Sequence, residues 1–312
     1  MEPFLVTRVA HITSTEATST WLVEGLWGEQ AVGFIGGPPK SAKTWLALEL
    51  AVAVASGRPC LGRYPVRARG PVLLYAAEDS AAAIKHRVSA LAQVRGIDDL
   101  ERLAVGLITE HDLRLDDVEH QQRLAVTLEK IQPRLLILDP LVRLHRSDEN
   151  SAGDVALLLD YLRQLQRRFA LAVILVHHVR KSPADQPGQT LRGSGDLHAW
   201  SDSSLYLLRR KGRIELHAEH RCFPSPAPLS IALAADPRPH LEIDEQAEQE
   251  PAVDPLAERI LGVLAARPMT RTALRDQLGV RNERLGEVLG ALGASGQIVK
   301  RGGLLAVPVP TP

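Results

Sequence analysis

The chain has 312 residues, of which 45% are hydrophobic and 24% are charged, and its 37 lysines and arginines balance 37 aspartates and glutamates. A neutral chain has no global field that draws it to nucleic acid or a membrane surface, so nucleic-acid binding would need a local basic patch. The two cysteines, Cys60 and Cys222, form no CxxC pair, which excludes a disulfide framework and favours the cytoplasm.

The first 30 residues form an N-terminal segment without the apolar run of a signal peptide. The longest apolar run of the chain, 169–176, has eight residues, whereas a membrane span needs about 20. We therefore expect a cytoplasmic protein with no membrane partner.

Residues 31–240 alternate short apolar runs with amphipathic stretches, which is typical of repeated βαβ units. Several runs lack polar alternation, as expected for strands covered by helices on both faces. The predicted strands are 31–36, 71–77, 103–109, 134–139 and 170–176, and the predicted helices lie near 43–56, 80–95, 116–131 and 153–168. Three later strands, 204–208, 213–219 and 229–233, should extend one edge of the sheet through hairpins. The expected fold class is α/β, with a mostly parallel sheet flanked by helices.

The stretch 244–255 is acidic, carries prolines and has no apolar period, so a linker is predicted at residues 241–254. Residues 255–312 contain three short amphipathic stretches followed by two β runs around Gly302 and Gly303. Three helices and a hairpin over about sixty residues are typical of a winged helix-turn-helix. We therefore expect a small winged-helix domain at 255–312.

A phosphate-binding loop is predicted where the first core strand turns into its helix. In GFIGGPPKSAKT, Gly37, Lys43 and Thr44 occupy the first Gly, the Lys and the Ser/Thr of G-x-x-x-x-G-K-[ST]. Backbone N–H groups of such a loop bind phosphate oxygens, the lysine reaches the β- and γ-phosphates, and the hydroxyl ligates Mg²⁺. We predict ATP and Mg²⁺ as cofactors. The expected nucleotide contacts are Gly36, Gly37, Pro38, Pro39, Lys40, Ser41, Ala42, Lys43, Thr44 and Trp45.

Ala42 departs from the motif, which has its second glycine at this position. The methyl group enters a crowded turn, so one alternative is a decayed loop, and the chain would then be a nucleotide-binding scaffold without turnover. Alanine is the smallest possible intrusion, however, and the strand–loop–helix context is intact. We favour a functional loop.

Two carboxylates complete the predicted site. Asp139 ends the apolar strand LLILD and can hold Mg²⁺ through water. A strand that ends in aspartate is weak evidence by itself, but together with a phosphate-binding loop upstream in the sequence it is strong evidence for a nucleotide site. Glu78 directly follows the strand 71–77 and can polarise the attacking water. Its neighbours Asp79 and Ser80 offer the alternative of a helix N-cap.

His177 and His178 end the strand that begins near residue 170. A metal pair is unfavourable because adjacent residues on a strand point to opposite faces. We expect one of them to face the nucleotide as a phosphate sensor and take His178 as the candidate, with His177 and a purely structural role as alternatives.

The segments GGPPKSAKT, LLYAAEDS, LLILDPL, LVHHVRK and LRGS, in this order, resemble the RepA-like branch of RecA-type ATPases over about residues 20–235. The resemblance implies a RecA-like core, ATP hydrolysis, assembly of identical subunits in a ring or filament (the best-known relatives are hexameric plasmid helicases), and frequently single-stranded DNA as the track. Lys43 and Thr44 match the Walker A pair, Asp139 the Walker B acid, Glu78 the catalytic glutamate, and His177 or His178 the sensor.

The resemblance also implies a basic residue that reaches the γ-phosphate of a neighbouring subunit. Arg221, in AEHRCF, is the best match, with an ordinary surface arginine as the alternative. The family commonly carries Lys or Arg two places before this finger, where the present chain has Glu219. Arg192, in LRGSGDLHAW, is a second candidate or part of a structural turn.

DNA contacts are expected on two core loops and on the C-terminal domain. In RecA-like proteins the loops after the Walker B strand and after the next strand face the track; here they are 143–150 and 180–189. Neither loop has an aromatic residue for base stacking. Their basic residues are Arg143, Arg146, Arg180 and Lys181, and their acidic residues include Asp148, Glu149 and Asp185.

Residues 254–303 contain eight Lys/Arg against five Asp/Glu, and four of the basic residues fall on the predicted recognition helix and wing: Arg281, Arg284, Lys300 and Arg301. We expect single-stranded DNA on the core loops and duplex on the winged helix, with protein docking as the alternative for the latter. The sequence thus favours a DNA-dependent ATPase or helicase. The alternative is an ATP-driven regulatory or loading protein of a mobile element that does not unwind DNA.

Overall fold

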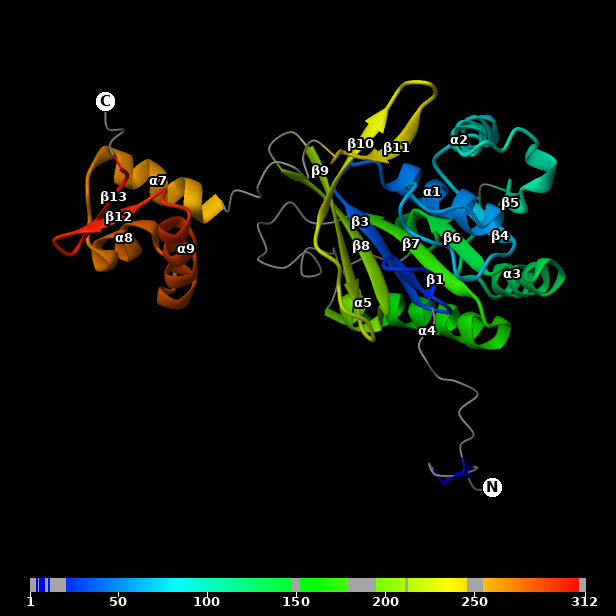
Figure 1. The fold of residues 1–312 in the computed structure, drawn as a ribbon. Coiled ribbons are helices and arrows are strands. Elements are labelled where there is room, and N and C mark those ends of the chain that lie inside the picture. Colours follow the sequence, from blue (N-terminus) through cyan, green and yellow to red (C-terminus); the bar gives the residue numbers. More distant parts are fainter. Residues whose placement is uncertain are drawn as a thin grey trace. The chain divides into compact units, whose positions relative to one another are not determined.

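A computed structural model describes residues 21–110, 112–146, 152–178, 195–210, 213–245 and 255–308, together with Phe4, residues 6–8 and His11. The chain divides into two compact units, Met1–Glu245 and Gln246–Pro312 (Figure 1). No helix in the described part of either unit is long and apolar enough to cross a membrane.

The first unit is built on a sheet with the strand order β11-β10-β9-β8-β3-β7-β6-β4-β5. The parallel part comprises β3 (Val32–Gly37), β4 (Val72–Ala76), β5 (Val105–Ile108), β6 (Leu135–Asp139), β7 (Ala172–His178) and β8 (Ser203–Arg210). Three antiparallel strands extend it at one edge: β9 (Arg213–His220), β10 (Leu229–Ala234) and β11 (His240–Ile243). The predicted core strands and the edge extension by hairpins are confirmed, and β11 adds a strand that was not predicted.

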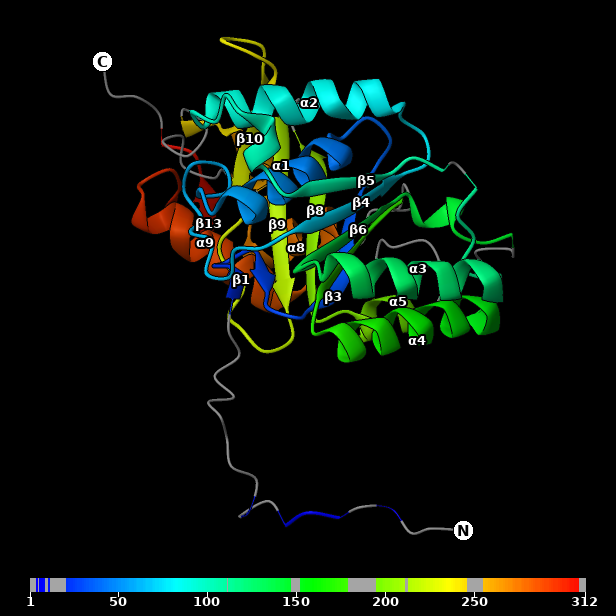
Figure 2. The ribbon, with the colours of Figure 1, turned by 90° about the vertical axis from the view of Figure 1, so that its right-hand side faces the viewer.

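Helices cover both faces of this sheet (Figure 2). On one face lie α1 (Lys43–Ser56) and α2 (Ala81–Val94); on the other lie α3 (Val118–Ile131), α4 (Ala152–Phe169) and α5 (Gly195–Trp200). Alternate strand residues enter two separate cores, with Ile35 and Ile137 facing α1 and Phe34 and Leu138 facing α4. Because both faces are buried, the strands need no polar alternation. The expected α/β fold class, a mostly parallel sheet flanked by helices, is confirmed.

The folded core begins before residue 31 and ends after residue 240. A hairpin of β1 (Trp21–Val23) and β2 (Trp27–Gly28) lies within the segment that showed no predicted element. Trp27 is fully buried, and its indole Nε1 donates to the carbonyl oxygen of Ala31 at 3.2 Å. These strands are too short to produce a periodic pattern, so only tertiary packing reveals them.

The second unit contains α7 (Pro255–Ala266), α8 (Arg271–Leu278), α9 (Asn282–Ala294), β12 (Val299–Arg301) and β13 (Leu304–Ala306). Its helices pack around a small core that includes Ile260, Leu274 and Leu285. β12 pairs with β13 antiparallel, and Met269 bridges Leu305. The three helices and the hairpin are therefore where the sequence placed them, while the winged-helix role of this unit stays a prediction.

Candidate functional site

A cleft opens at the carboxyl ends of the parallel strands, above the loop that joins β3 to α1, with about 990 Å³ of open space. In open α/β sheets, ligands bind at this end of the strands. The lining residues come from the β3–α1 loop, the ends of β4, β6 and β7, helix α2 and the edge hairpins: Lys40, Ser41, Ala42, Lys43, Thr44, Trp45, Glu78, Asp79, Arg87, Asp139, Pro140, Val176, His178, Arg209, Ile214 and Leu233.

The β3–α1 loop has the tight geometry of a phosphate cradle. Lys40 and Ala42 both adopt left-handed backbone conformations, with φ of 62° and 67°. A Cβ atom at Gly37 would lie 2.5 Å from Ser41 Oγ and 2.8 Å from the carbonyl oxygen of Leu207, so only glycine fits there. The turn is thus held by the close approach of β8 on one side and by the start of α1 on the other.

Ala42 occupies the N-cap of α1 in this left-handed conformation. Glycine is the residue for which positive φ is free of strain, and an alanine costs about 1 kcal/mol more at such a position. Its methyl group packs against the core on the α1 face. The departure from the motif therefore introduces backbone strain at this residue.

Lys43, Thr44 and Asp139 converge in the cleft. The Lys43 ammonium donates to the Pro38 carbonyl oxygen at 2.9 Å, and the Thr44 hydroxyl donates to Asp139 Oδ2 at 2.7 Å. Burial lowers the pKa of Lys43, against the opposing effects of Asp139 and Glu78. Burial raises the pKa of Asp139 to about 6, against the hydrogen bond from Thr44. A hydroxyl and a carboxylate in direct contact can ligate one Mg²⁺ ion together with phosphate oxygens.

The residues present fit a magnesium–nucleotide complex. Ser41 Oγ is buried inside the loop and has no hydrogen-bond partner among the described residues. A buried hydroxyl without a partner is costly, and a phosphate oxygen at the loop would supply one. The Lys43 ammonium meets a backbone carbonyl only five residues before it, a contact that a phosphate can replace.

Glu78, Asp79 and Ser80 follow β4 and have three different partners. Glu78 lines the cleft and pairs with Arg143, at 3.1 Å between Oε1 and Nε. Asp79 holds Arg87 through two hydrogen bonds, of 2.7 and 3.0 Å. Ser80 is the N-cap of α2 and accepts from the N–H of Ala83. The sequence left the cap open between Asp79 and Ser80, and the geometry assigns it to Ser80.

The two histidines of β7 point to opposite faces of the sheet. His178 lines the cleft, whereas His177 is buried, with its ring centroid 6.2 Å from that of Phe34 in the other core. The strand alternation therefore leaves His178 as the histidine that faces the candidate nucleotide site. No group of three or more His, Cys, Asp and Glu side chains suited to a metal occurs in the described part of the chain.

Arg221 does not join the cleft of its own chain. It follows β9, whose last residue pairs with Ser203 at the start of β8, so it lies at the opposite end of the strands from the phosphate loop. Arg221 Nη1 pairs with Asp202 Oδ1 at 3.2 Å. A role toward a neighbouring subunit stays a prediction. Arg192 and the residues 147–150 and 180–189 of the two predicted DNA loops lie outside the described residues.

Sequence patterns missed two cations of the cleft, Arg87 and Arg209. Arg209 Nη2 donates to the Lys40 carbonyl oxygen at 2.8 Å, and the Arg87 guanidinium lies 5.6 Å from the centroid of the Trp45 ring. Arg209 reaches the loop because β8 pairs in parallel with β3, a contact between segments about 170 residues apart. No local motif encodes such a contact.

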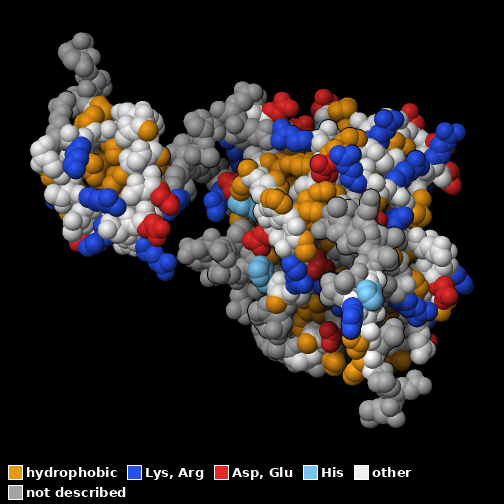
Figure 3. All heavy atoms as spheres, turned by 60° about the horizontal axis from the view of Figure 1, so that its bottom comes forward, with side chains coloured by type: hydrophobic (Ala, Val, Ile, Leu, Met, Phe, Trp, Pro, Cys, Tyr) orange, Lys and Arg blue, Asp and Glu red, His pale blue; other side chains and the backbone are white. Residues whose placement is uncertain are grey.

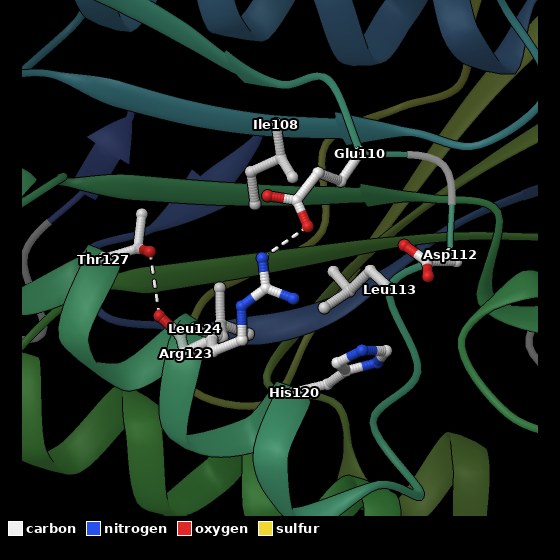
Figure 4. A pocket seen from close by; sticks show the side chains of 8 residues that line it. All are labelled: Ile108, Glu110, Asp112, Leu113, His120, Arg123, Leu124 and Thr127. Carbon is white, nitrogen blue, oxygen red and sulfur yellow. Dashed lines mark hydrogen bonds and ion pairs between the residues drawn. The ribbon is translucent and has the colours of Figure 1, made fainter.

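A second pocket lies between β5 and α3, and Figure 4 shows an ion pair across it. Arg123 forms an ion pair with Glu110 across the pocket, and the Thr127 hydroxyl donates to the Arg123 carbonyl oxygen. His120 Nδ1 accepts from the N–H of Arg114 at 3.0 Å. These contacts give Glu110, His120, Arg123 and Thr127 structural partners, and we assign the pocket no ligand.

A family model and a solved structure, among others, are similar to this chain. A family model described as an AAA domain matches residues 2–184, which is more than half of the chain. Among solved structures, the RadB recombinase is similar with a TM-score of 0.48 and 21% sequence identity, over 66% of this chain and 88% of that chain.

Proposed function

The chain belongs to the AAA-domain family whose model it matches, and we propose that it hydrolyses ATP with Mg²⁺ in the cleft above the β3–α1 loop. The convergence of Lys43, Thr44, Asp139 and Glu78 on one cleft carries this proposal. Two of these residues are already in contact, Thr44 with Asp139, although 95 positions separate them in the sequence.

Each residue has a role that its position supports. Mg²⁺, when bound, neutralises charge on the β- and γ-phosphate oxygens. Thr44 and Asp139 would hold the ion, and Lys43 would exchange the Pro38 carbonyl for phosphate oxygens. Glu78 would orient a water molecule and accept its proton as the water oxygen bonds to the γ-phosphorus and the bond to the ADP oxygen breaks. His178 would contact the departing phosphate end of the nucleotide.

We propose further that the ATPase assembles from identical subunits and acts on DNA, as the RepA-like resemblance implies. Arg221 is half-exposed at the end of the strands opposite the phosphate loop, a position that would suit it to the nucleotide of a neighbouring subunit. On the face drawn in Figure 3, basic and acidic side chains are interspersed, so contacts to phosphate would have to be local. Arg281 and Lys300 are exposed on the second unit and could supply them there.

Phosphate release tests the enzyme claim. Wild type should release phosphate from ATP with Mg²⁺, Glu78→Gln should lose turnover while still binding nucleotide, and Glu101→Gln, at an exposed glutamate of η2 (Leu100–Arg102), should match wild type. Equal rates for wild type and Glu78→Gln would refute the assignment of the base.

Strand displacement separates the two modes of action on DNA. A helicase should open a forked duplex in the presence of ATP and lose this activity with Glu78→Gln. If single-stranded DNA raises ATP turnover but no duplex opens, the regulatory or loading function is correct.

A further inference from the structure

We propose that the cleft above the β3–α1 loop selects nucleotides by the size of the base and not by its hydrogen-bonding edge. Arg87 and Trp45 form a stacking platform for the base, and Leu233 with Ile214 supplies an apolar contact that only a purine is large enough to fill. The cleft then takes ATP and GTP alike, in preference to CTP and UTP. The inference rests on the proposed function, because it places the nucleotide phosphates at the β3–α1 loop.

The lining of the cleft contains a group of side chains that the phosphate chemistry does not use. This group comes from two helices and two edge strands: Trp45 of α1, Arg87 of α2, Ile214 of β9 and Leu233 of β10. Trp45 directly follows Thr44, the proposed magnesium ligand, so the group begins where the phosphate cradle ends. A nucleoside attached to phosphates in the cradle would therefore have these side chains to contact.

Arg87 is held as a flat platform before any ligand binds. Its guanidinium makes two hydrogen bonds to Asp79, of 2.7 and 3.0 Å, and its Cζ lies 5.6 Å from the centroid of the Trp45 ring. The Arg87 side chain is 26% exposed, so part of it is open to the cleft that it lines. Guanidinium planes and aromatic rings both stack on nucleobases. Because two partners already fix the side chain, stacking takes little of its conformational freedom.

Leu233 is an apolar side chain that the core does not cover. On β10, Leu229 and Ile231 belong to the core on the α1 face and are 6% and 2% exposed. Leu233 follows in the same alternation, yet it is 48% exposed and lines the cleft. Ile214, which pairs with Ile231 from β9, lines the cleft as well. A base placed over these side chains would remove apolar surface from water, and this gain grows with the area of the base.

The lining offers little that distinguishes adenine from guanine. These bases differ in the donors and acceptors along one edge, and a site that reads the edge needs polar groups placed against it. Among the described lining residues, the side-chain hydroxyls are Ser41 and Thr44, both in the phosphate cradle, and there is no asparagine, glutamine or tyrosine. Asp79, which could accept from an exocyclic amine, has both carboxylate oxygens bonded to Arg87. Selection between bases of equal size should therefore be weak.

Steady-state phosphate release from ATP, GTP, CTP and UTP with Mg²⁺ tests the proposal. The kcat/KM for GTP should lie within about fivefold of that for ATP, whereas the values for CTP and UTP should be at least about tenfold lower, mainly through KM. The Kd values of ADP, GDP and CDP, measured by calorimetry with Mg²⁺, should follow the same order. This second measurement makes the test independent of turnover.

Two substitutions locate the selection. Leu233→Ala should raise the KM for ATP and GTP about fivefold and leave the KM for CTP and UTP within about twofold, so that the preference for purines shrinks. Arg87→Lys keeps the positive charge but removes the plane, so it should raise the KM for ATP and GTP as much as Arg87→Ala does. Leu157→Ala, at a 72% exposed leucine of α4, is the matched control and should leave every ratio between bases unchanged.

Three results would overturn the proposal: a preference of more than about a hundredfold for ATP over GTP, equal KM and Kd values for purine and pyrimidine nucleotides, or an unchanged preference for purines in both Leu233→Ala and Arg87→Lys. Failure of the proposed function looks different. A chain that binds ADP and GDP more tightly than CDP yet releases no phosphate from ATP refutes hydrolysis alone, whereas a chain that hydrolyses ATP and rejects GTP refutes selection by base size alone.

Discussion

Substitution of Asp139 by asparagine should raise the stability of the fold and abolish ATP turnover. The residue is 8% exposed, and burial raises the pKa of its carboxyl from 3.8 to about 6. Each pKa unit corresponds to about 1.36 kcal/mol, so keeping this carboxylate ionised in the folded protein costs about 3 kcal/mol at neutral pH. Asp139→Asn removes that cost, and its amide oxygen can still accept from Thr44.

The sign follows from the direction of the shift. Burial favours the protonated carboxyl, so the stabilising contribution of Asp139 is complete below about pH 3.8 and is lost as the pH rises to about 6. Asp139→Asn should therefore exceed wild type in free energy of unfolding by up to about 3 kcal/mol near pH 7.5, and by about half of that near pH 5. The same variant should lose magnesium-dependent ATP turnover.

Urea unfolding without nucleotide, followed by tryptophan fluorescence, measures this difference in unfolding free energy for the first unit, Met1–Glu245. All four tryptophans lie in the first unit, so the signal reports on the domain that contains Asp139. Asp98→Asn, at an exposed aspartate, should leave the unfolding free energy unchanged. If Asp139→Asn is no more stable than wild type at either pH, the carboxylate is not held in the buried environment described above.

Three further substitutions test separate parts of the structure. Ala42→Gly should stabilise the protein in urea by up to about 1 kcal/mol without loss of turnover, since glycine tolerates positive φ; a clear loss of stability would show that the methyl packing outweighs the strain. Arg95→Ala should lower the free energy of unfolding by about 3–5 kcal/mol, because it leaves the fully buried Glu49 without its ion-pair partner. The double variant Arg95→Ala with Glu49→Gln should regain part of this loss. A loss below about 1 kcal/mol for Arg95→Ala would contradict the buried pair. Arg87→Ala should raise the KM for ATP several-fold with little change in kcat, because Arg87 lines the cleft and pairs with Asp79 and not with the proposed base; an unchanged KM would remove Arg87 from the nucleotide site.

The elements that the sequence predicted are those with local signals. Apolar runs bounded by turn residues identified the core strands, and the motif around Lys43 placed the phosphate loop between a strand and a helix. Alternation along a strand also predicted that only one of His177 and His178 could face the cleft. In each case the information lies within about ten consecutive residues.

The features that the sequence did not predict depend on contacts between distant segments. Arg209 reaches the Lys40 carbonyl oxygen only because β8 pairs with β3, and Arg143 meets Glu78 only because β6 neighbours β4. The hairpin at residues 21–28 is identified by the burial of Trp27, which no periodicity reveals. These contacts depend on the order of the strands in the sheet, which local patterns in a single sequence do not predict.

The central claim is that nucleotide phosphates bind at the β3–α1 loop, neutralised by Lys43 and one magnesium ion. Calorimetric titration of the full chain with ATP tests it most directly. We expect saturable binding in the presence of Mg²⁺, weaker binding with a chelator, at least about a tenfold loss of affinity for Lys43→Ala, and wild-type affinity for Lys85→Ala, at an exposed lysine of α2. Absence of binding at millimolar ATP, or equal affinity for wild type and Lys43→Ala, would contradict it.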